Sequence, residues 1–346
     1  MEANVGKMIV SGNNINVPVP WGHIAVKECG NLEGRPIFLM HGWLDNCGSF
    51  QPILPYFTAN YRMICIDAPG HGLSSHYPLG MMYQTLDCLI NIRRVAKYFN
   101  IKSFGIIGHS MGANYGLLFA ATHPESVDFL IMLDIAKPIS RPLEATVTRA
   151  RKGVDDFISC EENSIQKLPK EHTLETATNR MIEGMYQITL GHLFGATLHI
   201  DHTNILIVCV LFLNLGSNSL ISKDNMTYDG CQYLLPRALK EVKEHTYIFT
   251  RDMRLYPSSL YGFTNDVIKE FAKSIVCPHL VILADKCSGF EVKQNIDLIL
   301  DEYKANNKQF VLKNVDTTHH GHLTEPEKVA PIIKSFLEQI NSTLSQ

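Results

Sequence analysis

The chain has 346 residues, about twice the length of a typical domain, so we expect one large or two interdependent domains. Its residues are 45% hydrophobic and 19% charged, with 23 glycines and 16 prolines, which excludes collagen-like, disordered and small disulfide-stabilised proteins. The 31 basic and 34 acidic residues give a net charge of −3 without long blocks of one sign. We therefore expect no nucleic-acid partner.

We expect no secretory signal peptide at the N-terminus. Residues 1–20 contain no continuous apolar stretch preceded by basic residues. The nine cysteines are odd in number, and some lie in apolar runs, which is typical of reduced core thiols. We therefore expect an intracellular protein, in the cytoplasm. A peroxisomal location is the alternative, although the chain does not end in the Ser-Lys-Leu address.

Short apolar runs and helical patterns alternate along most of the chain. Six runs bounded by turn residues predict buried strands of a mostly parallel sheet, at 37–40, 63–66, 104–107, 129–133, 280–283 and 310–312. Helical periodicity predicts helices at 85–99, 113–122, 266–275, 292–303 and 327–340. This alternation predicts an α/β fold with helices on both faces of the sheet.

The alternation stops at residues 138–262, where charged helical patterns occupy 145–157, 174–186 and 233–244. We interpret 138–262 as a helical cap inserted between two parts of a core, residues 1–137 and 263–346.

Residues 205–213 are nine apolar residues without helical or alternating period, inside the predicted cap. A membrane helix needs about 20 such residues, so we expect no membrane span. One interpretation is a buried cap element. We favour the other, in which residues 195–219 are an atypical apolar insertion into the fold, poorly packed and prone to aggregation.

The sequence Gly108-His109-Ser110-Met111-Gly112 is a G-x-S-x-G motif. It follows a predicted strand and precedes a helical pattern, which is the context of a nucleophile elbow. In such a turn the serine is held in a strained conformation above the sheet, and the small glycines avoid a collision. We therefore predict Ser110 as a catalytic nucleophile. The following helix N-terminus supplies the N–H of Met111 to a developing oxyanion.

A second oxyanion donor is expected after the strand predicted at 37–40, where the chain reads His41-Gly42-Trp43. We predict the backbone N–H of Trp43 in this role, paired with that of Met111. His41 lies between a strand and a tight glycine turn, so we interpret it as a brace of the loop.

Five segments together carry a resemblance: His41-Gly-Trp-Leu-Asp, Gly48-Ser-Phe, Asp67-Ala-Pro-Gly-His-Gly-Leu-Ser, Gly108-His-Ser-Met-Gly and His319-His-Gly-His-Leu. They resemble the α/β-hydrolase fold, and most closely the serine hydrolase-like protein family. The resemblance covers nearly the whole chain except about 195–219. It implies a hydrolase with a cap over the active site and a small-molecule substrate. It also implies that Asp67 and His71 brace a loop.

The catalytic base should be a late histidine, because these triads run serine, acid, histidine along the chain. His319, His320 and His322 follow the strand-like residues 309–315. By resemblance the base lies seven residues before Pro326, which selects His319, with His322 and then His320 as alternatives. A metal site in this cluster is the competing interpretation. No second group of cysteine, aspartate or histidine at ligand spacing supports it, so we expect no metal and no cofactor.

The acid of the triad has two candidates. The usual position, after the strand predicted at 280–283, aligns best with Cys287, and Asp285 stands two residues earlier. Asp134 directly follows the strand predicted at 129–133 and resembles the acid of some dehalogenase-type relatives. We favour Asp134 over Asp285. Serine at position 110 disfavours dehalogenase and epoxide hydrolase chemistry, which needs a carboxylate nucleophile.

These residues predict a serine hydrolase that forms an acyl-enzyme intermediate on a small or medium hydrophobic ester. The alternative is a catalytically impaired member of the fold that binds a small apolar ligand in the same cavity.

Overall fold

The computed structural model describes residues 10–193, 226–257, 262–287 and 291–344. The insertion expected at 195–219 lies outside the described residues, as does the apolar run within it. Among the residues that are described, no helix is long and apolar enough to cross a membrane.

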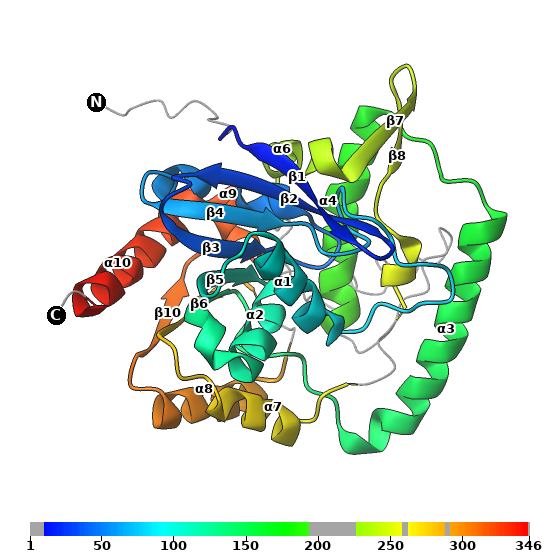
Figure 1. The fold of residues 1–346 in the computed structure, drawn as a ribbon. Helices are drawn as coiled ribbons and strands as arrows, with labels where there is room; N and C mark the ends of the chain where they lie inside the picture. The colour runs from blue at the N-terminus through cyan, green and yellow to red at the C-terminus, as the bar shows by residue number, and fades with distance from the viewer. Residues whose placement is uncertain (1–9, 194–225, 258–261, 288–290, 345–346) are drawn as a thin grey trace.

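The described chain is organised around an eight-stranded sheet (Figure 1). Both β1 and β4 pair antiparallel with β2, and all other neighbours are parallel. In spatial order the strands are β1 (Asn13–Val19), β2 (Gly22–Gly30), β4 (Tyr61–Ile66), β3 (Arg35–Met40), β5 (Phe104–His109), β6 (Val127–Leu133), β9 (His279–Ala284) and β10 (Phe310–Val315). The mostly parallel α/β sheet predicted from the sequence is therefore confirmed. The sequence analysis did not predict β1 and β2.

Helices cover both faces of this sheet, because successive strand residues point to opposite sides. In β3, Phe38 and Met40 pack into one apolar cluster with four helices, while Ile37 and Leu39 pack into a second cluster with one long helix. The four helices of the first cluster are α1 (Asp87–Tyr98), α2 (Met111–Thr122), α7 (Asn265–Lys273) and α8 (Lys293–Asn306). The long helix of the second cluster is α10 (Pro326–Leu344).

The predicted cap contains a hairpin as well as helices. Its described elements are the short η4 (Leu143–Ala145), α3 (Thr146–Gln166), α4 (Leu174–Leu193), α6 (Tyr228–Ala238), β7 (Leu239–Lys243), β8 (Thr246–Phe249) and the short η6 (Met253–Leu255). The helix predicted at 233–244 is wrong beyond Ala238. His245 takes a left-handed conformation with φ 55°, which reverses the chain and lets β7 pair antiparallel with β8. In Figure 1, α3 and this hairpin lie far from the C-terminus.

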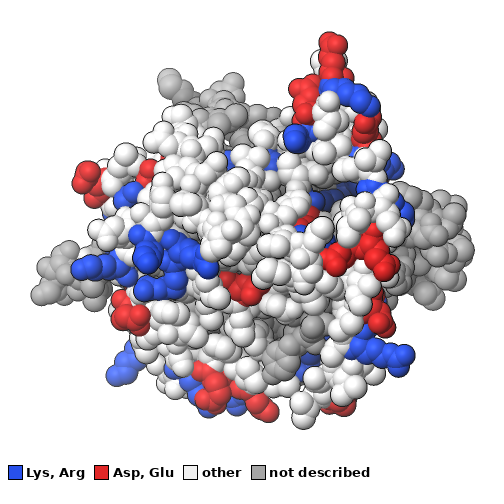
Figure 2. Space-filling model, turned by 45° about the vertical axis from the view of Figure 1, so that its right-hand side comes forward, with Lys and Arg blue, Asp and Glu red and all other residues white. Residues whose placement is uncertain are grey.

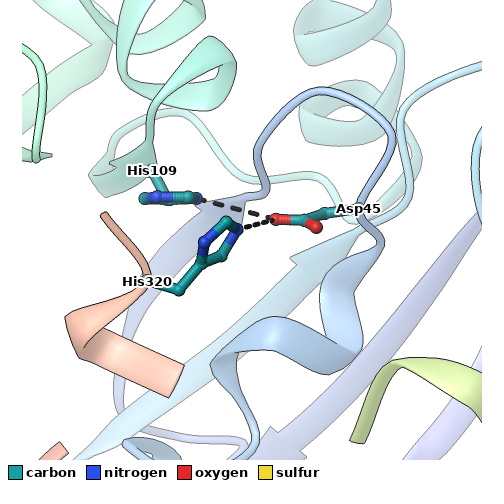
Figure 3. A group of neighbouring side chains, drawn as sticks. All are labelled: Asp45, His109 and His320. Atoms are coloured by element: carbon teal, nitrogen blue, oxygen red, sulfur yellow. Dashed lines mark hydrogen bonds and ion pairs between the residues drawn. The ribbon is translucent and has the colours of Figure 1, made fainter. Parts of the chain in front are cut away.

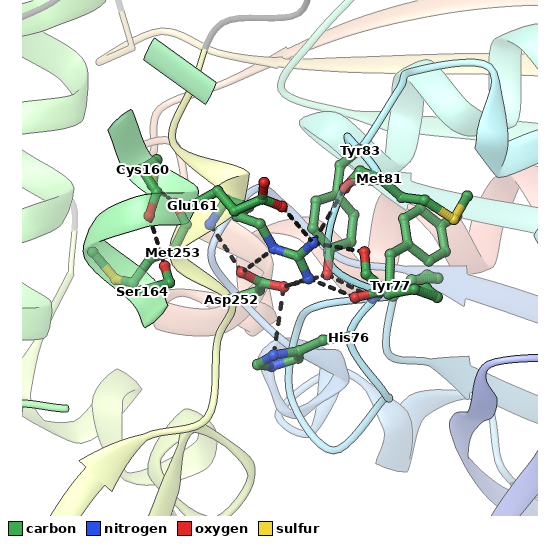
Figure 4. A network of polar contacts seen from close by, with 12 residues as sticks. His76, Tyr77, Met81, Tyr83, Cys160, Glu161, Ser164, Asp252 and Met253 are labelled. Carbon is green, nitrogen blue, oxygen red and sulfur yellow. Dashed lines mark hydrogen bonds and ion pairs between the residues drawn. The ribbon is translucent and has the colours of Figure 1, made fainter. Parts of the chain in front are cut away.

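A buried ionic network joins the predicted cap to the core (Figure 4). The Arg254 guanidinium forms a forked pair with Asp252, at 2.7 Å to Oδ2 and 3.2 Å to Oδ1. It also donates to the carbonyl oxygens of Tyr77 and Pro78 in the loop before α1. The Tyr83 hydroxyl donates to Asp252 Oδ2 at 2.7 Å.

On the face of the molecule shown in Figure 2, charged side chains lie in small groups that are separated by uncharged surface.

Candidate active site

Ser110 lies in a sharp turn between the end of β5 and the start of α2. Its backbone has φ 51° and ψ −113°, a strained conformation for a residue with a side chain. The two flanking glycines are required by close approach. A Cβ at Gly108 would collide with the backbone of Gly112, and a Cβ at Gly112 would collide with the carbonyl oxygen of Met40. The turn therefore has the geometry of a nucleophile elbow and packs directly on the end of β3.

The loop after β3 is held rigidly beside this elbow. The His41 ring donates from Nδ1 to the Gly42 carbonyl at 2.7 Å and accepts at Nε2 from the Ala68 N–H at 3.0 Å. The two ring nitrogens thus contact backbone groups of two loops, after β3 and after β4, as a bracing role of His41 requires. The indole N–H of Trp43 donates to the Leu255 carbonyl at 3.1 Å, which fixes the loop against the predicted cap.

Asp67 and His71 contact backbone groups of the loops at the same edge of the sheet. Asp67 accepts from the backbone N–H groups of Cys47 and Leu73, both at 2.8 Å, and is paired with Arg237 at 2.9 Å. Burial lowers the pKa of His71 to about 3, and its Nδ1 lies 3.1 Å from the Pro69 carbonyl.

Asp134 and His319 come together at the same edge of the sheet. Asp134 directly follows β6, and its Oδ2 lies 2.6 Å from Nδ1 of His319. Its other oxygen accepts from the backbone N–H of Ala284 at 2.7 Å, while its own N–H donates to the Ile282 carbonyl. Asp134 takes φ 55°, and both side chains are more than nine-tenths buried. The carboxylate can therefore orient the imidazole and stabilise its charged form.

Asp285, the alternative acid, is exposed and accepts from the Asn314 amide at 3.0 Å. The residue near the histidine on this loop is Cys287, whose Sγ lies 3.8 Å from His319 Nδ1. Burial and the nearby Asp134 carboxylate raise the pKa of the Cys287 thiol well above its usual range. The structure therefore places the Asp134 carboxylate, and not that of Asp285, against the His319 ring.

The alternative bases, His320 and His322, lie in other surroundings. The Nε2 atom of His320 is 3.2 Å from Asp45 Oδ2. His322 is fully buried, and burial together with the neighbouring His320 lowers its pKa to about 3. An imidazole that stays neutral in this way is poorly suited to accept a proton near neutral pH. Of the three histidines, His319 is the one that the structure brings to Asp134.

Comparison with known proteins shows the family of this chain. The profile of the alpha/beta hydrolase fold matches residues 35–156. A probable serine hydrolase of Drosophila melanogaster is 31% identical over 330 residues, which cover 95% of this chain and 88% of the fly protein. Human serine hydrolase-like protein 2 is 30% identical over 349 residues, with 98% and 97% of the two chains covered. The chain belongs to the serine hydrolase-like protein family.

Solved structures show the same fold at lower sequence identity. A hypothetical protein from Pseudomonas aeruginosa PAO1 superposes with a TM-score of 0.70 at 20% identity, covering 96% of this chain and 99% of its own. A thioesterase domain from the curacin biosynthetic pathway has a TM-score of 0.66 at 18% identity and covers 93% and 99% of the two chains. These structures therefore show the α/β-hydrolase fold of this chain.

This family member carries a second buried polar group that sequence reasoning missed (Figure 3). His109, the residue before Ser110, lies with its Nδ1 3.7 Å from Asp45 Oδ2. Its Nε2 donates to the backbone carbonyl of His319 at 2.9 Å. His109, Asp45 and His320 thus connect the elbow, the loop after β3 and the loop after β10. Asp45 belongs to the His41-Gly-Trp-Leu-Asp segment, but no spacing in the sequence linked it to the histidines.

An apolar cavity of about 60 Å³ lies next to the loop after β3. It is bordered by Met40 and His41 at the end of β3, by Leu255 from the predicted cap, and by the rings of Tyr77, Tyr83 and Tyr115. Since Leu255 also accepts from Trp43, the cavity adjoins the loop that carries the predicted oxyanion donor.

Proposed function

We propose that this chain is a serine hydrolase that cleaves small or medium hydrophobic esters through an acyl-enzyme intermediate. Ser110 is the nucleophile, His319 the general base and Asp134 the acid of the triad. The observation that carries the proposal is the 2.6 Å contact between Asp134 Oδ2 and His319 Nδ1. It occurs at the sheet edge that also holds Ser110 in a strained elbow, in a family of serine hydrolase-like proteins.

The chemistry follows from the orientation of the His319 imidazole, whose Nδ1 faces the Asp134 carboxylate. Nε2 of His319 removes the Ser110 hydroxyl proton as the oxygen attacks the ester carbonyl, while Asp134 stabilises the imidazolium. The N–H groups of Trp43 and Met111 hold the resulting oxyanion. The imidazolium then gives its proton to the departing alkoxide, which leaves as the alcohol. Water, deprotonated by the same imidazole, hydrolyses the acyl-enzyme and releases the acid.

A hydrophobic substrate is supported by the cavity beside the Trp43 loop. Its border is formed mainly by aliphatic and aromatic side chains, such as Met40, Leu255 and Tyr115. Such a surface favours an apolar acyl or alcohol group, with few polar contacts to fix its orientation.

The proposal is tested with a fluorophosphonate probe and a series of p-nitrophenyl esters of increasing acyl length. We expect covalent labelling of the full chain and turnover that favours short and medium acyl groups. Ser110→Ala should abolish labelling and lower kcat by at least about 1,000-fold, because the covalent step is lost. Ser274→Ala, at an exposed serine after α7, is the matched control and should behave as the parent does.

A folded parent protein that neither reacts with the probe nor hydrolyses any ester would overturn the proposal. That result, combined with saturable binding of a short-chain ester or alcohol, would favour the catalytically impaired, ligand-binding member of the fold.

A further inference from the structure

The group formed by Asp45, His109 and His320 is completely enclosed by protein. The three side chains are between 0% and 4% exposed. One carboxylate oxygen and two ring nitrogens converge, with Asp45 Oδ2 3.2 Å from His320 Nε2 and 3.7 Å from His109 Nδ1. All three atoms lie within 4.8 Å of one another (Figure 3). Burying a carboxylate against two imidazoles is costly unless each polar atom finds a partner.

Nδ1 of His109 faces the Asp45 carboxylate with a lone pair, because the ring carries its proton on Nε2. A carbonyl oxygen can only accept, so the 2.9 Å contact with the His319 carbonyl requires that Nε2 of His109 carries the proton. In the neutral ring Nδ1 then has no proton to offer Asp45. Among the described residues, Nδ1 of His109 has no hydrogen-bond partner although it is fully buried. A nitrogen lone pair and a carboxylate oxygen repel each other, and a cation between them would remove this repulsion.

Two of the three separations are close to those between ligand atoms of a tetrahedral metal ion, and the third is no more than 4.8 Å. Zinc binds imidazole nitrogen and carboxylate oxygen at about 2.0 to 2.2 Å, which places neighbouring ligand atoms about 3.3 Å apart. The observed separations of 3.2 and 3.7 Å bracket this value. The contact of His109 Nε2 with a backbone carbonyl is also the arrangement that typically orients a metal-binding histidine.

We propose that Asp45, His109 and His320 form a buried binding site for a divalent transition-metal ion, for which zinc is the best match. Two imidazoles and a carboxylate suit zinc better than calcium or magnesium, which prefer oxygen ligands alone. The ring of a further histidine, His322, has its centroid 4.2 Å from that of His109. His322 is not among the three residues whose ligand atoms lie within 4.8 Å of one another, so water is the expected fourth ligand.

The other group of three, Asp134, Cys287 and His319, does not share this feature. There Nδ1 of His319 meets a carboxylate oxygen at 2.6 Å, which is an ordinary charge-assisted hydrogen bond. The hydrogen bond between Nδ1 of His319 and the Asp134 carboxylate therefore needs no cation.

The metal has a structural consequence. It would join the loop after β3, the residue before Ser110 and the residue after His319, so that three active-site segments share one centre. The sequence analysis expected no metal because the late histidines had no partner group at ligand spacing. The fold supplies that group, since β3 and β5 are neighbours in the sheet and bring Asp45 and His109 together.

The test uses the untagged full chain, produced with zinc in the medium and analysed by elemental mass spectrometry. We expect about one zinc ion per chain in the parent and less than about 0.2 in His320→Ala and Asp45→Asn, because losing one of few protein ligands sharply weakens a structural site. Two control variants should keep the parent's zinc content. Cys287→Ala removes the thiol of the other group, and His245→Ala removes an exposed histidine.

Refolding gives a second measurement that does not depend on the variants. The parent, unfolded in guanidinium chloride and refolded with EDTA or with zinc, should have the higher Tm with zinc, and cobalt should produce the visible absorption of a four-coordinate site. His320→Cys should retain the metal, because a thiolate is also a zinc ligand. A parent without zinc and without a Tm shift on refolding would overturn the proposal, as would zinc retained in His320→Ala but lost in Cys287→Ala. Neither result bears on fluorophosphonate labelling of Ser110.

Discussion

The Asp134 carboxylate lies 2.6 Å from Nδ1 of His319, although 185 residues separate them along the chain. The contact depends on the sheet, in which β6 pairs with β9 and Leu133 lies opposite Ile282. The ends of these two strands are therefore adjacent. Cys287, in the loop after β9, also lies close to the same nitrogen, at 3.8 Å. A carboxylate after either strand can thus reach the same imidazole, and in this chain the carboxylate that contacts it follows β6.

Asp134→Asn should lower kcat for ester hydrolysis by about 1,000- to 10,000-fold, as expected when the imidazole loses the carboxylate that orients it. The asparagine can keep the contact with the Ala284 N–H and tolerates the positive φ at this position. Asp285→Asn is the matched control and should stay within about twofold of the parent, since surface substitutions rarely matter. A larger loss in Asp285→Asn than in Asp134→Asn would assign the acid to the later strand.

The same geometry predicts a rescue. In the Asp134→Asn background, Cys287→Asp should restore at least about tenfold of kcat, because a carboxylate there can reach the imidazole again. Cys287→Asn in that background has the same shape without the charge and should restore nothing. Equal recovery in both double variants would show that side-chain shape, and not charge, is the limiting factor.

The sequence was most informative where a pattern is local. Strands β3 to β6, β9 and β10 were predicted because each is a buried apolar run. Strand β1, at the edge of the sheet, was missed because it reads Asn-Asn-Ile-Asn-Val-Pro-Val and is largely exposed. In the site, the G-x-S-x-G motif indicated Ser110, and the family resemblance selected His319 and favoured Asp134 at the end of its strand. The contact of Asp45 with His109 and His320 depends on which strands are neighbours, and sequence separation does not carry this information.

Ser110→Gly should unfold at a higher urea concentration than Ser110→Ala, although both variants should lack labelling by the probe. The backbone of Ser110 has φ 51° and ψ −113°, where a side chain is strained and glycine is not. We expect a difference of about 1 to 2 kcal/mol in the free energy of unfolding, the cost of one strained residue. Equal midpoints for the two variants would mean that the elbow stores no such strain.

Arg254→Met should destabilise the protein by about 3 to 5 kcal/mol, measured by urea denaturation, because it removes the guanidinium that pairs with the buried Asp252 carboxylate. Burial disfavours the charge on Asp252, but hydrogen bonds from Arg254 and Tyr83 outweigh it and lower the pKa of the carboxyl (Figure 4). Lys243→Met is the control. Its ion pair with Glu171 is exposed, so its loss should have little effect. Similar destabilisation in both variants would exclude a special role for the buried network.

His279→Phe should reduce the loss of stability in mild acid. His279 is fully buried in β9, with its ring against Tyr303 and Phe310, and burial lowers its pKa from 6.5 to about 3. The folded protein therefore keeps this ring neutral, while the unfolded chain takes up a proton below pH 6.5, so stability falls as the pH falls through that value. Between pH 7.5 and 5 one such histidine contributes a loss of about 2 kcal/mol.

Urea denaturation at pH 7.5 and at pH 5 measures the difference in the free energy of unfolding. This difference should be smaller for His279→Phe than for the parent, by about that amount. His245→Gln, at an exposed turn, should retain the full difference of the parent. An unchanged difference in His279→Phe would show that this ring is protonated, or reached by water, in the folded state.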